Sequence, residues 1–390
     1  MVTAGKAVSG GLWVVMLAGM VAAAQQGNSA PADRSWTLGP WTRGASEPVI
    51  RPDPTQMYAD PVSGKSVHWE ALHTFNPAAV VRGGKIYVLY RAEDDTGKMA
   101  IAEHVSRVGM AVSGDGIHFR QEPQPVFGPA NDDQLEREGE GGTEDPRVVE
   151  APDGSYVLTY TQWSRKRQSW SVGLATSPDL RHWTKHGHIF AGVSGGAYDG
   201  TYRYKSAGIL TERKRGRLIA AKLHGKFWMY WGEVEVHLAT SPDLIHWTPL
   251  ETTPGKPLVL LARRPGLPDA EFPEMGPPPV LTRRGIVVIY NAKNTEFPDR
   301  PGAPRPDPDL APGTYSVEEA LFDAADPAKL LARTVQPVFQ PELPFERSGQ
   351  WKPGTTFSEG LVLFKGKWWM YYGCADSFVG VAWAPGAAGR

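Results

Sequence analysis

VSGDGIHF, at residues 112–119, returns as TSPDLRHW at 176–183 and again as TSPDLIHW at 240–247. Each copy is a Ser-x-Asp turn that ends in an aromatic residue and follows an apolar stretch. The same interval separates Ser113 from Ser177 and Ser177 from Ser241. Such even spacing indicates an internal repeat, in which each copy contributes one supersecondary unit.

A second series of repeats interleaves with these turns. Five apolar runs are each interrupted by a glycine-containing or charged turn and end in a tyrosine. They are AAVVRGGKIYVLY (78–90), RVVEAPDGSYVLTY (147–160), AGILTERKRGRLIAAKLHGKFWMY (207–230), PPVLTRRGIVVIY (278–290) and GLVLFKGKWWMYY (360–372). Alternating β-branched and aromatic residues around a tight turn predict β-hairpins.

Together the two series predict an all-β fold, a five-bladed β-propeller with about 70 residues in each blade. SVEEALFDAADPAKLLA (316–332) is the best helical candidate, but its Asp-Pro pair favours a strand and turn at least as strongly. A pair of β-sandwiches is the alternative architecture, and it explains the even spacing less well. We expect a single catalytic domain over residues 36–390.

The composition agrees with a turn-rich globular fold, with 43 glycines and 35 prolines in 390 residues. The net charge is -1 and no basic stripe is present, which argues against nucleic acid as a partner. Fourteen tryptophans suit both a large core and the binding of sugar rings. The single cysteine, Cys374, predicts a buried small hydrophobe and no internal disulfide.

The N-terminus has the pattern of a secretory signal peptide. Lys6 precedes the apolar run GGLWVVMLAGMVAAA (10–24), and Ala22 and Ala24 form an A-x-A cleavage site. We therefore expect a signal peptide over residues 1–24, a linker over 25–35, and export to the periplasm or the medium. The run is too short and too rich in small residues to predict a membrane span.

Polar residues follow the tyrosine of every hairpin. These tails are RAEDD (91–95), TQWSRK (161–166), WGEVE (231–235), NAKNTE (291–296) and GCADS (373–377), and GEGGTEDPRVV (139–149) adds adjacent carboxylates at a strand start. In a propeller such tails meet around one axis, and glycoside cleavage needs an acid and a second carboxylate in one pocket. No metal-ligand spacing, phosphate loop or serine-hydrolase motif is present, so we expect no metal and no cofactor.

FNPA (75–78), LYRAED (89–94), GTEDPRV (142–148), GPPPVLT (276–282) and YYGCADSFVGVA (371–382) occur in the order found in glycoside hydrolase family 130. The chain resembles that family, whose members are five-bladed propellers acting on β-mannosides. FWMYWGE (227–233) and IYNAKN (289–294) are similar to its branch of exported β-mannosidases, particularly those active on β-1,2-linked mannose.

The resemblance implies a role for individual residues. Asp145, the aspartate of EDPR, matches the catalytic acid, which in phosphorolytic members is thought to act through a sugar hydroxyl. Four residues match positions that hold the sugar at the cleavage point: Asn76, Arg91, Arg147 and Asp376. The other predicted substrate-binding residues lie in or near the same motifs: Asp94, Glu144, Lys205, Asn291 and Lys293.

Family members use either water or phosphate to cleave the bond. The related phosphorylases carry a lysine before GPPP, whereas this chain has PDAEFPEMGPPP (268–279), which is acidic. Carboxylates repel phosphate but can activate water, so we predict an inverting hydrolase with Glu233 or Glu274 as the base and Glu271 behind them. Lys205 and His224 are counter-evidence, because either could bind an anion.

Three other functions stay open at this point. One is a β-mannoside phosphorylase, and another is a carbohydrate-binding propeller without catalysis. The third is a hydrolase of furanosides, which the Ser-x-Asp turns suggest and the five ordered motifs oppose. The expected partner in all cases is an oligosaccharide, manno-oligosaccharide above others.

Overall fold

Strands form where the apolar runs lie in the sequence, because β-branched and aromatic residues fit a pleated, half-buried surface. The computed structural model describes residues 34–200 and 204–386, and all of these except Arg34 belong to one compact unit, Ser35–Arg390. The protein is all-β, and each of the five predicted hairpins forms. The predicted signal peptide and residues 25–33 of the predicted linker lie outside the described residues.

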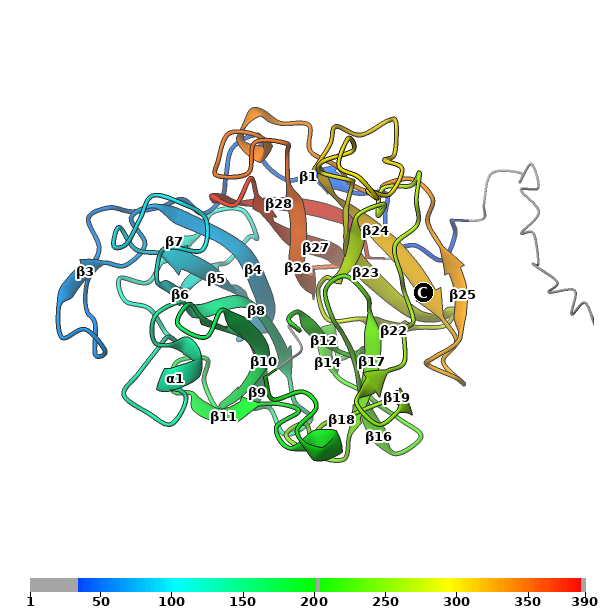
Figure 1. The fold of residues 1–390 in the computed structure, drawn as a ribbon, viewed down its shortest axis with the longest axis horizontal. Coiled ribbons are helices and arrows are strands. Elements are labelled where there is room, and N and C mark those ends of the chain that lie inside the picture. The colour runs from blue at the N-terminus through cyan, green and yellow to red at the C-terminus, as the bar shows by residue number, and fades with distance from the viewer. Residues whose placement is uncertain (1–33, 201–203, 387–390) are drawn as a thin grey trace, which may run out of the picture. The chain divides into compact units, whose positions relative to one another are not determined.

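The strands pair into antiparallel groups that follow one another along the chain (Figure 1). The first group contains β4 (His73–Arg82), β5 (Lys85–Glu93), β6 (Ser106–Ser113) and β7 (Arg120–Gln121). The second contains β8 (Gly142–Glu150), β9 (Tyr156–Ser164), β10 (Ser169–Ser177) and β11 (Thr184–His188). The third contains β12 (Ala207–Ile209), β15 (Lys222–Leu223), β16 (Lys226–Trp231), β17 (His237–Ser241) and β18 (Thr248–Pro249), and the hairpin of β13 (Thr211–Lys214) and β14 (Arg217–Ala220) continues its first strands.

The fourth group contains β21 (Phe272–Met275), β22 (Val280–Thr282), β23 (Gly285–Lys293), β24 (Tyr315–Phe322) and β25 (Leu330–Arg333). The stretch 316–332 is therefore a strand and turn rather than a helix. The last group contains β26 (Thr356–Phe364), β27 (Lys367–Cys374), β28 (Phe378–Pro385) and the N-terminal β1 (Thr42–Arg43), which pairs with β28. The remaining elements are β2 (Met57–Ala59), β3 (Ser66–His68), β19 (Glu251–Thr253), β20 (Lys256–Pro257), the helix α1 (Leu135–Glu138) and the 3₁₀ turns η1 (Val193–Gly195) and η2 (Pro344–Glu346).

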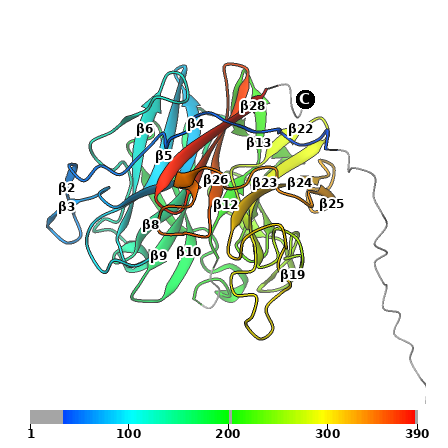
Figure 2. The ribbon, with the colours of Figure 1, turned by 90° about the horizontal axis from the view of Figure 1, so that it is seen from above.

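The first strands of these groups approach one another in the middle of the unit (Figures 1 and 2). Single parallel pairings join neighbouring groups, such as Ser106 with Gly142 and Ile219 with Glu150. At Gly360 a β-carbon would lie 2.7 Å from the carbonyl oxygen of Pro77, so glycine allows β26 to lie against β4. Residues at the ends of these strands are thereby brought close together, although they are distant in the sequence.

The tyrosines that end the hairpins are structural. All five are buried, and the ring of Tyr90 lies across Gly109 on the next strand, where a β-carbon would be 2.4 Å from the ring. The hydroxyl of Tyr90 donates a hydrogen bond to Glu70 at 2.7 Å, which satisfies its polar end inside the core. The predicted repeat therefore marks packing positions rather than substrate contacts.

The three Ser-x-Asp turns close β6, β10 and β17 in the same way. Ser113 Oγ accepts a hydrogen bond from Gly116 N at 2.8 Å, and Asp115 Oδ1 accepts from the backbone N–H groups of Ile117 and His118. The same bonds recur at Ser177 and at Ser241. Short polar side chains that bond their own backbone favour such turns, so this repeat also belongs to the scaffold.

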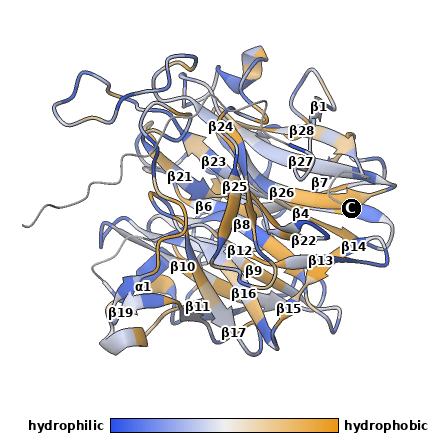
Figure 3. Ribbon diagram, turned by 90° about the vertical axis from the view of Figure 1, so that its right-hand side faces the viewer, coloured by the Kyte–Doolittle hydropathy of each residue, from blue (hydrophilic) through white to orange (hydrophobic). Residues whose placement is uncertain are grey.

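The core lies between the strand groups, where hydrophobic stretches of strand face one another (Figure 3). Cys374 is buried in one of these clusters, as expected for a small hydrophobe. Among the described residues no helix has the length and apolar character needed to cross a membrane.

Candidate active site

The candidate site is built on strained backbone at the ends of the first strands. Asn76 and Asp145 have φ values of 46° and 48°, and β-bulges interrupt β4 and β8 at these residues. Ala375 and Asp376, directly after β27, also have positive φ. Asparagine and aspartate tolerate this left-handed conformation better than most residues, and strained positions cluster at functional sites. Each bulge turns a polar side chain toward the others.

Asp145, the predicted catalytic acid, is almost fully buried, with 1% exposure. Its Oδ1 accepts hydrogen bonds from Asn76 Nδ2 at 2.7 Å and from Arg91 Nη1 at 3.3 Å, and its Oδ2 faces Lys205 Nζ at 3.5 Å. Burial favours the neutral acid, but the charges of Lys205 and Arg91 outweigh it and hold the pKa of Asp145 below its usual range. In the free protein Asp145 is therefore an ionised carboxylate.

The pKa of Glu144 is shifted in the opposite direction from that of Asp145. Burial raises its pKa to about 7, although Arg91 opposes this effect, and the neighbouring charge of Asp145 adds to the rise. Its Oε1 lies 2.7 Å from Arg91 Nη2 and 3.3 Å from Ser106 Oγ. Adjacent carboxylates titrate as a pair, so this pair keeps one proton until about neutral pH, on Glu144 rather than Asp145.

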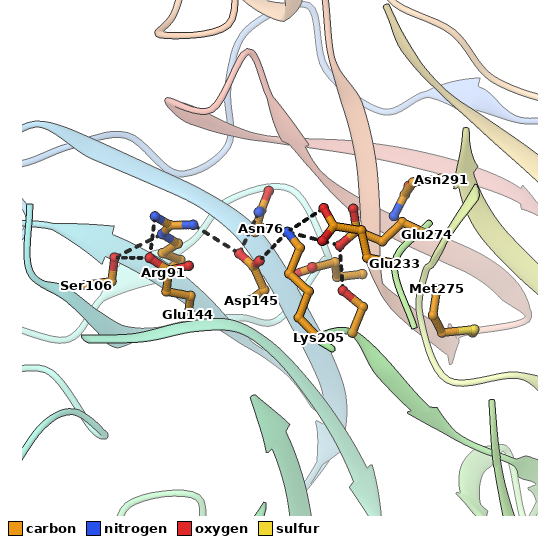
Figure 4. A network of polar contacts seen from close by, with 12 residues as sticks. Asn76, Arg91, Ser106, Glu144, Asp145, Lys205, Glu233, Glu274, Met275 and Asn291 are labelled. Atoms are coloured by element: carbon orange, nitrogen blue, oxygen red, sulfur yellow. Dashed lines mark hydrogen bonds and ion pairs between the residues drawn. The ribbon is translucent and has the colours of Figure 1, made fainter. Parts of the chain in front are cut away.

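Lys205 lies at the centre of the site, between Asp145 on one side and Glu233 and Glu274 on the other (Figure 4). Its Nζ is 3.2 Å from Glu274 Oε1, 3.5 Å from Asp145 Oδ2 and 3.7 Å from Glu233 Oε1. The three carboxylates outweigh the effect of burial and raise the pKa of Lys205 well above its usual value. Lys205 thus joins the predicted acid to both predicted bases.

Glu233 and Glu274 face each other across an isolated antiparallel bridge between their backbones. Glu274 is buried; its Oε1 accepts a hydrogen bond from Ser206 Oγ at 2.5 Å, and its Oε2 has no hydrogen-bond partner among the described residues. Glu233 is only partly buried. Burial raises the pKa of Glu233 to about 7, against the charge of Lys205 and with that of Glu274.

Arg91 connects Asp145 to the other half of the site. Its guanidinium contacts Glu93 Oε1 at 2.6 Å, Glu144 Oε1 at 2.7 Å and Asp145 Oδ1 at 3.3 Å, and it stacks 4.6 Å above the Phe75 ring. Nearby, burial raises the pKa of Asp376 to about 6, although Arg91 lowers it. Arg91 and Asp376, two of the four residues predicted to hold the sugar, therefore interact electrostatically with Asp145.

Two other predicted substrate-binding residues, Arg147 and Asn291, have their polar groups engaged by the protein. Arg147 donates hydrogen bonds to the carbonyls of Gly276 and Met275 at 2.8 and 2.6 Å and contacts Glu359 at 2.9 Å. The amide of Asn291 bonds the backbone N–H and C=O of Ser358. These contacts tie β8 to β21 and β23 to β26, so Arg147 and Asn291 position the strands that carry the site.

Asp94 lies in a separate ion pair. Its Oδ2 accepts a hydrogen bond from Arg107 Nη1 at 2.6 Å, and its Oδ1 accepts from the backbone N–H of Thr96 at 3.1 Å. These contacts hold the loop after β5 in place, and a contact of Asp94 with the sugar stays a prediction.

Lys293 is enclosed by aromatic rings. Its Nζ lies 4.7 Å from the Trp351 ring centroid and 5.4 Å from those of Phe272 and Tyr315, and it pairs with Glu296 at 2.7 Å. Tyr315 is close enough to Glu274 and Glu233 to be affected by their charge. Lys293 therefore lies beside the two predicted bases, on the side where the aromatic rings are.

Several site residues were missing from the sequence prediction. Glu93 stands inside the motif LYRAED and Ser206 directly after Lys205, so position alone could have suggested both. Ser106 begins β6 and Tyr315 begins β24, and nothing in the sequence indicated where their side chains lie. Glu359 is fully buried, and its carboxylate contacts Arg147. Among the described residues, His224 and Glu271 form no hydrogen bond or ion pair with Asp145 or Lys205. Glu271 instead pairs with Arg300 at 3.2 Å.

A surface cleft of about 700 Å³ lies elsewhere, between two of the Ser-x-Asp turns. Its lining includes Val157, Phe227 and Leu244, with Asp153 and Asp243 at its edge. It contains none of the residues around Lys205. Because cleavage of a glycoside needs an acid opposite a second carboxylate, the site around Lys205, and not this cleft, is the candidate for chemistry.

The sequence is similar to a known enzyme family and to one of its characterised members. The sequence model of glycoside hydrolase family 130, described as β-1,4-mannooligosaccharide phosphorylase, matches residues 51–386. A 1,2-β-oligomannan phosphorylase from Thermoanaerobacter sp. (strain X514) is 30% identical over 80% of this chain and 90% of its own length.

Two solved structures are similar over almost the whole chain. A glycosyl hydrolase from Bacteroides ovatus is 44% identical, with a TM-score of 0.85 over 91% of this chain and 95% of the other. A second structure is also 44% identical, with a TM-score of 0.85 over 91% of this chain and 96% of the other, and it is described with the statement that this family of mannoside phosphorylases contains glycoside hydrolases that target β-1,2 mannosidic linkages in Candida mannan.

Proposed function

Because the chain belongs to glycoside hydrolase family 130, we propose that it is a hydrolase of β-mannosides, with β-1,2-linkages favoured and inversion at the anomeric carbon. The family contains phosphorylases and hydrolases that act on mannosides. The similarity to a 1,2-β-oligomannan phosphorylase and to the structure associated with β-1,2 mannosidic linkages supports the linkage. The choice of water over phosphate rests on the site.

One observation carries that choice: each cation around Asp145 is already in contact with carboxylates. Lys205 contacts three of them, Arg91 contacts three and Arg147 contacts Glu359. A phosphate site needs arginine, lysine or histidine donors that are not neutralised. In the described part of the site the excess charge is negative, which repels phosphate and leaves carboxylates to activate water.

The proposed mechanism assigns Asp145 as the acid and the Glu233–Glu274 pair as the base. Each of these carboxylates has an oxygen within 3.7 Å of Lys205 Nζ, so those oxygens are separated by at most twice that distance. Inverting enzymes hold their two carboxyl groups roughly 6.5–9.5 Å apart to leave room for water. We infer that the water lies on the Glu233–Glu274 side of the sugar.

Asp145 must gain a proton before it can act as an acid. We infer that the sugar draws Lys205 away from Asp145 when it binds, since the charge of Lys205 is the largest effect that keeps Asp145 ionised. The Glu144–Asp145 pair holds one proton up to about neutral pH, and this proton then moves to Asp145. Asn76, which donates to Asp145 Oδ1, keeps the carboxylate in place meanwhile.

The test is product analysis with and without phosphate. The purified enzyme is incubated with β-1,2-mannobiose in phosphate-free buffer and in the same buffer with inorganic phosphate. We expect equal release of mannose in both and no sugar 1-phosphate. Formation of sugar 1-phosphate, with no turnover in the phosphate-free sample, would show that the enzyme is a phosphorylase.

Two further parts of the proposal concern the architecture of the protein and its export from the cell. We propose that the five antiparallel groups are the blades of a five-bladed propeller, with the polar cluster around its axis. Family 130 is a β-propeller family, and the approach of β4, β8 and β26 supports this arrangement. We also propose that residues 1–24 direct export, which N-terminal sequencing of the mature protein tests by showing whether it begins at Gln25.

A carbohydrate-binding protein without catalysis is the second candidate from another class. It is disfavoured because Asp145 is present with its hydrogen bonds from Asn76 and Arg91 intact. Turnover of any manno-oligosaccharide excludes it.

A further inference from the structure

A second cluster of potential ligand atoms lies beside the proposed active site. His73 begins β4, Glu93 ends β5 opposite it in the antiparallel register, and His104 lies in the loop that follows. One nitrogen of each histidine and one carboxylate oxygen of Glu93 all lie within 4.8 Å of one another. None of these residues has a part in the proposed mechanism.

The histidine rings are held by contacts on their Nδ1 atoms. His104 Nδ1 is 2.8 Å from the carbonyl oxygen of Thr96, which can only accept, so Nδ1 carries the proton and Nε2 presents a lone pair. His73 Nδ1 is 2.9 Å from the hydroxyl of Ser377. A backbone carbonyl or another polar group on the second ring nitrogen is the usual support of a metal-binding histidine.

Glu93 is fixed as firmly as the histidines. Arg91 Nη2 donates to its Oε1 at 2.6 Å and Gln350 Nε2 donates to its Oε2 at 3.1 Å. Each oxygen retains a second lone pair. The carboxylate is therefore oriented and still able to bind a cation.

The electrostatic surroundings admit a cation in spite of Arg91. Arg91 contacts Glu144 and Asp145 as well as Glu93, so its charge is more than balanced. Neutral imidazole and carboxylate are the forms that bind metal ions.

We propose that His73, Glu93 and His104 form a binding site for a divalent transition metal ion of the Zn²⁺ type. Two imidazoles and a carboxylate suit zinc and its neighbours rather than calcium or magnesium, which prefer oxygen ligands. Ligand atoms around tetrahedral zinc lie roughly 3.3 Å apart with bonds of about 2.0–2.1 Å, so the three side chains close slightly around the ion. Water or a sugar hydroxyl would supply the fourth ligand of a tetrahedral ion.

This site was not predictable from the sequence, from which we expected no metal. The three ligands stand at 73, 93 and 104, without the short spacing of a zinc motif. They meet because β4 and β5 pair and the loop after β5 folds back over their ends.

The test is metal binding to the full enzyme after removal of metal with a chelator. Zn²⁺ is titrated calorimetrically, and Co²⁺ is added as a visible probe of tetrahedral nitrogen and oxygen ligands. We expect one equivalent to bind and the melting temperature to rise. His73→Gln and His104→Gln should each weaken Zn²⁺ binding by more than about tenfold.

The matched control is His118→Gln. His118 is exposed and contacts a single carboxylate, Asp115, at 2.8 Å, so its replacement should leave Zn²⁺ binding unchanged. Circular dichroism of each variant without metal shows whether it is folded. If His104→Gln does not fold, Zn²⁺ binding by His73→Gln, which changes a half-buried residue, is the test of the proposal. Absence of stoichiometric binding, or equal binding by wild type and His73→Gln, would overturn the proposal.

Discussion

Replacement of Lys205 by methionine is the perturbation that probes the site most directly. Methionine keeps the length of the side chain and removes the charge that contacts Asp145, Glu233 and Glu274. At separations of 3.2–3.7 Å each contact corresponds to about 4.5–5 kcal/mol at an effective dielectric constant of about 20. Breaking a buried pair costs about 3–5 kcal/mol in practice, because the remaining charges relax or take up protons.

How deeply Lys205 is buried determines how large a loss in the free energy of unfolding we expect from Lys205→Met. Its side chain is 22% exposed, so water screens part of the charge and we expect a loss of about 3 kcal/mol in the free energy of unfolding at pH 8. Lys329 pairs with Asp323 at 3.6 Å, but its side chain is 60% exposed. Lys329→Met should cost less than about 1 kcal/mol, as exposed ion pairs do. The ion pairs of Lys205 and Lys329 thus have similar N–O distances but differ in burial, so the two variants measure the effect of burial.

The loss should also depend on pH. The pKa of Glu233 is raised to about 7 in the folded protein, above its ordinary value, so its protonated form stabilises the fold at low pH and this stabilisation is lost as the pH rises through 7. Without Lys205 the carboxylates around it keep their protons to still higher pH. We therefore expect Lys205→Met to be better tolerated at pH 5 than at pH 8.

Urea unfolding of the wild type and both variants at these two pH values is the assay. Equal destabilisation by Lys205→Met and Lys329→Met, or a loss independent of pH, would refute the view that Lys205 balances a buried group of carboxylates. Lys205→Arg, which retains the charge, should recover most of the stability at pH 8.

Further predictions concern catalysis and the framework of the site. Asp145→Asn should lower kcat by about 10²–10⁴-fold while calorimetry still detects oligosaccharide binding; undiminished turnover would remove Asp145 from the mechanism. Nuclear magnetic resonance should detect α-mannose as the first anomer released from the β-linked substrate, and β-mannose first would mean retention. The alkaline limb of the kcat/KM profile should fall near pH 7 as the Glu144–Asp145 pair loses its last proton, and Glu144→Gln should move that limb; an unmoved limb would assign it to another group. Asn291→Ala should reduce stability by about 1–3 kcal/mol, since it leaves the buried N–H of Ser358 without its partner, and should change KM little if Asn291 acts through the strands; the reverse pattern would make it a sugar contact.

Much of the scaffold could be predicted from the sequence because its signals are local. The hairpins ending at Tyr90 and Tyr372 follow from alternating residues around short turns, and the turn at Ser113 follows from side chains that bond their own backbone. In the stretch 316–332 apolar periodicity suited a helix, but pairing of β24 with β23 satisfied its backbone as a strand.

The site could be predicted only in part, since its geometry comes from contacts between distant strands. Asp145 and Lys205 were found through motifs, and the structure brings both together with Glu233 and Glu274. Arg147 stands in the same motif as Asp145, yet it extends the other way and bonds the backbone of β21. A motif gives the identity of a residue, but the face of the strand on which it lies depends on bulges that the sequence does not reveal.

The site around Asp145 contains more carboxylates than cations, and both proposals depend on this excess. In the described structure, six carboxylates contact the three cations Arg91, Arg147 and Lys205, and they come from all five strand groups or the loops between them. Folding brings these charges together at a cost, and protonation relieves part of it, which is why the pKa values of Glu144 and Glu233 rise to about 7. The same excess repels phosphate and attracts a cation. The proposals of water as the nucleophile and of a metal ion at the edge of the cluster therefore rest on one charge distribution.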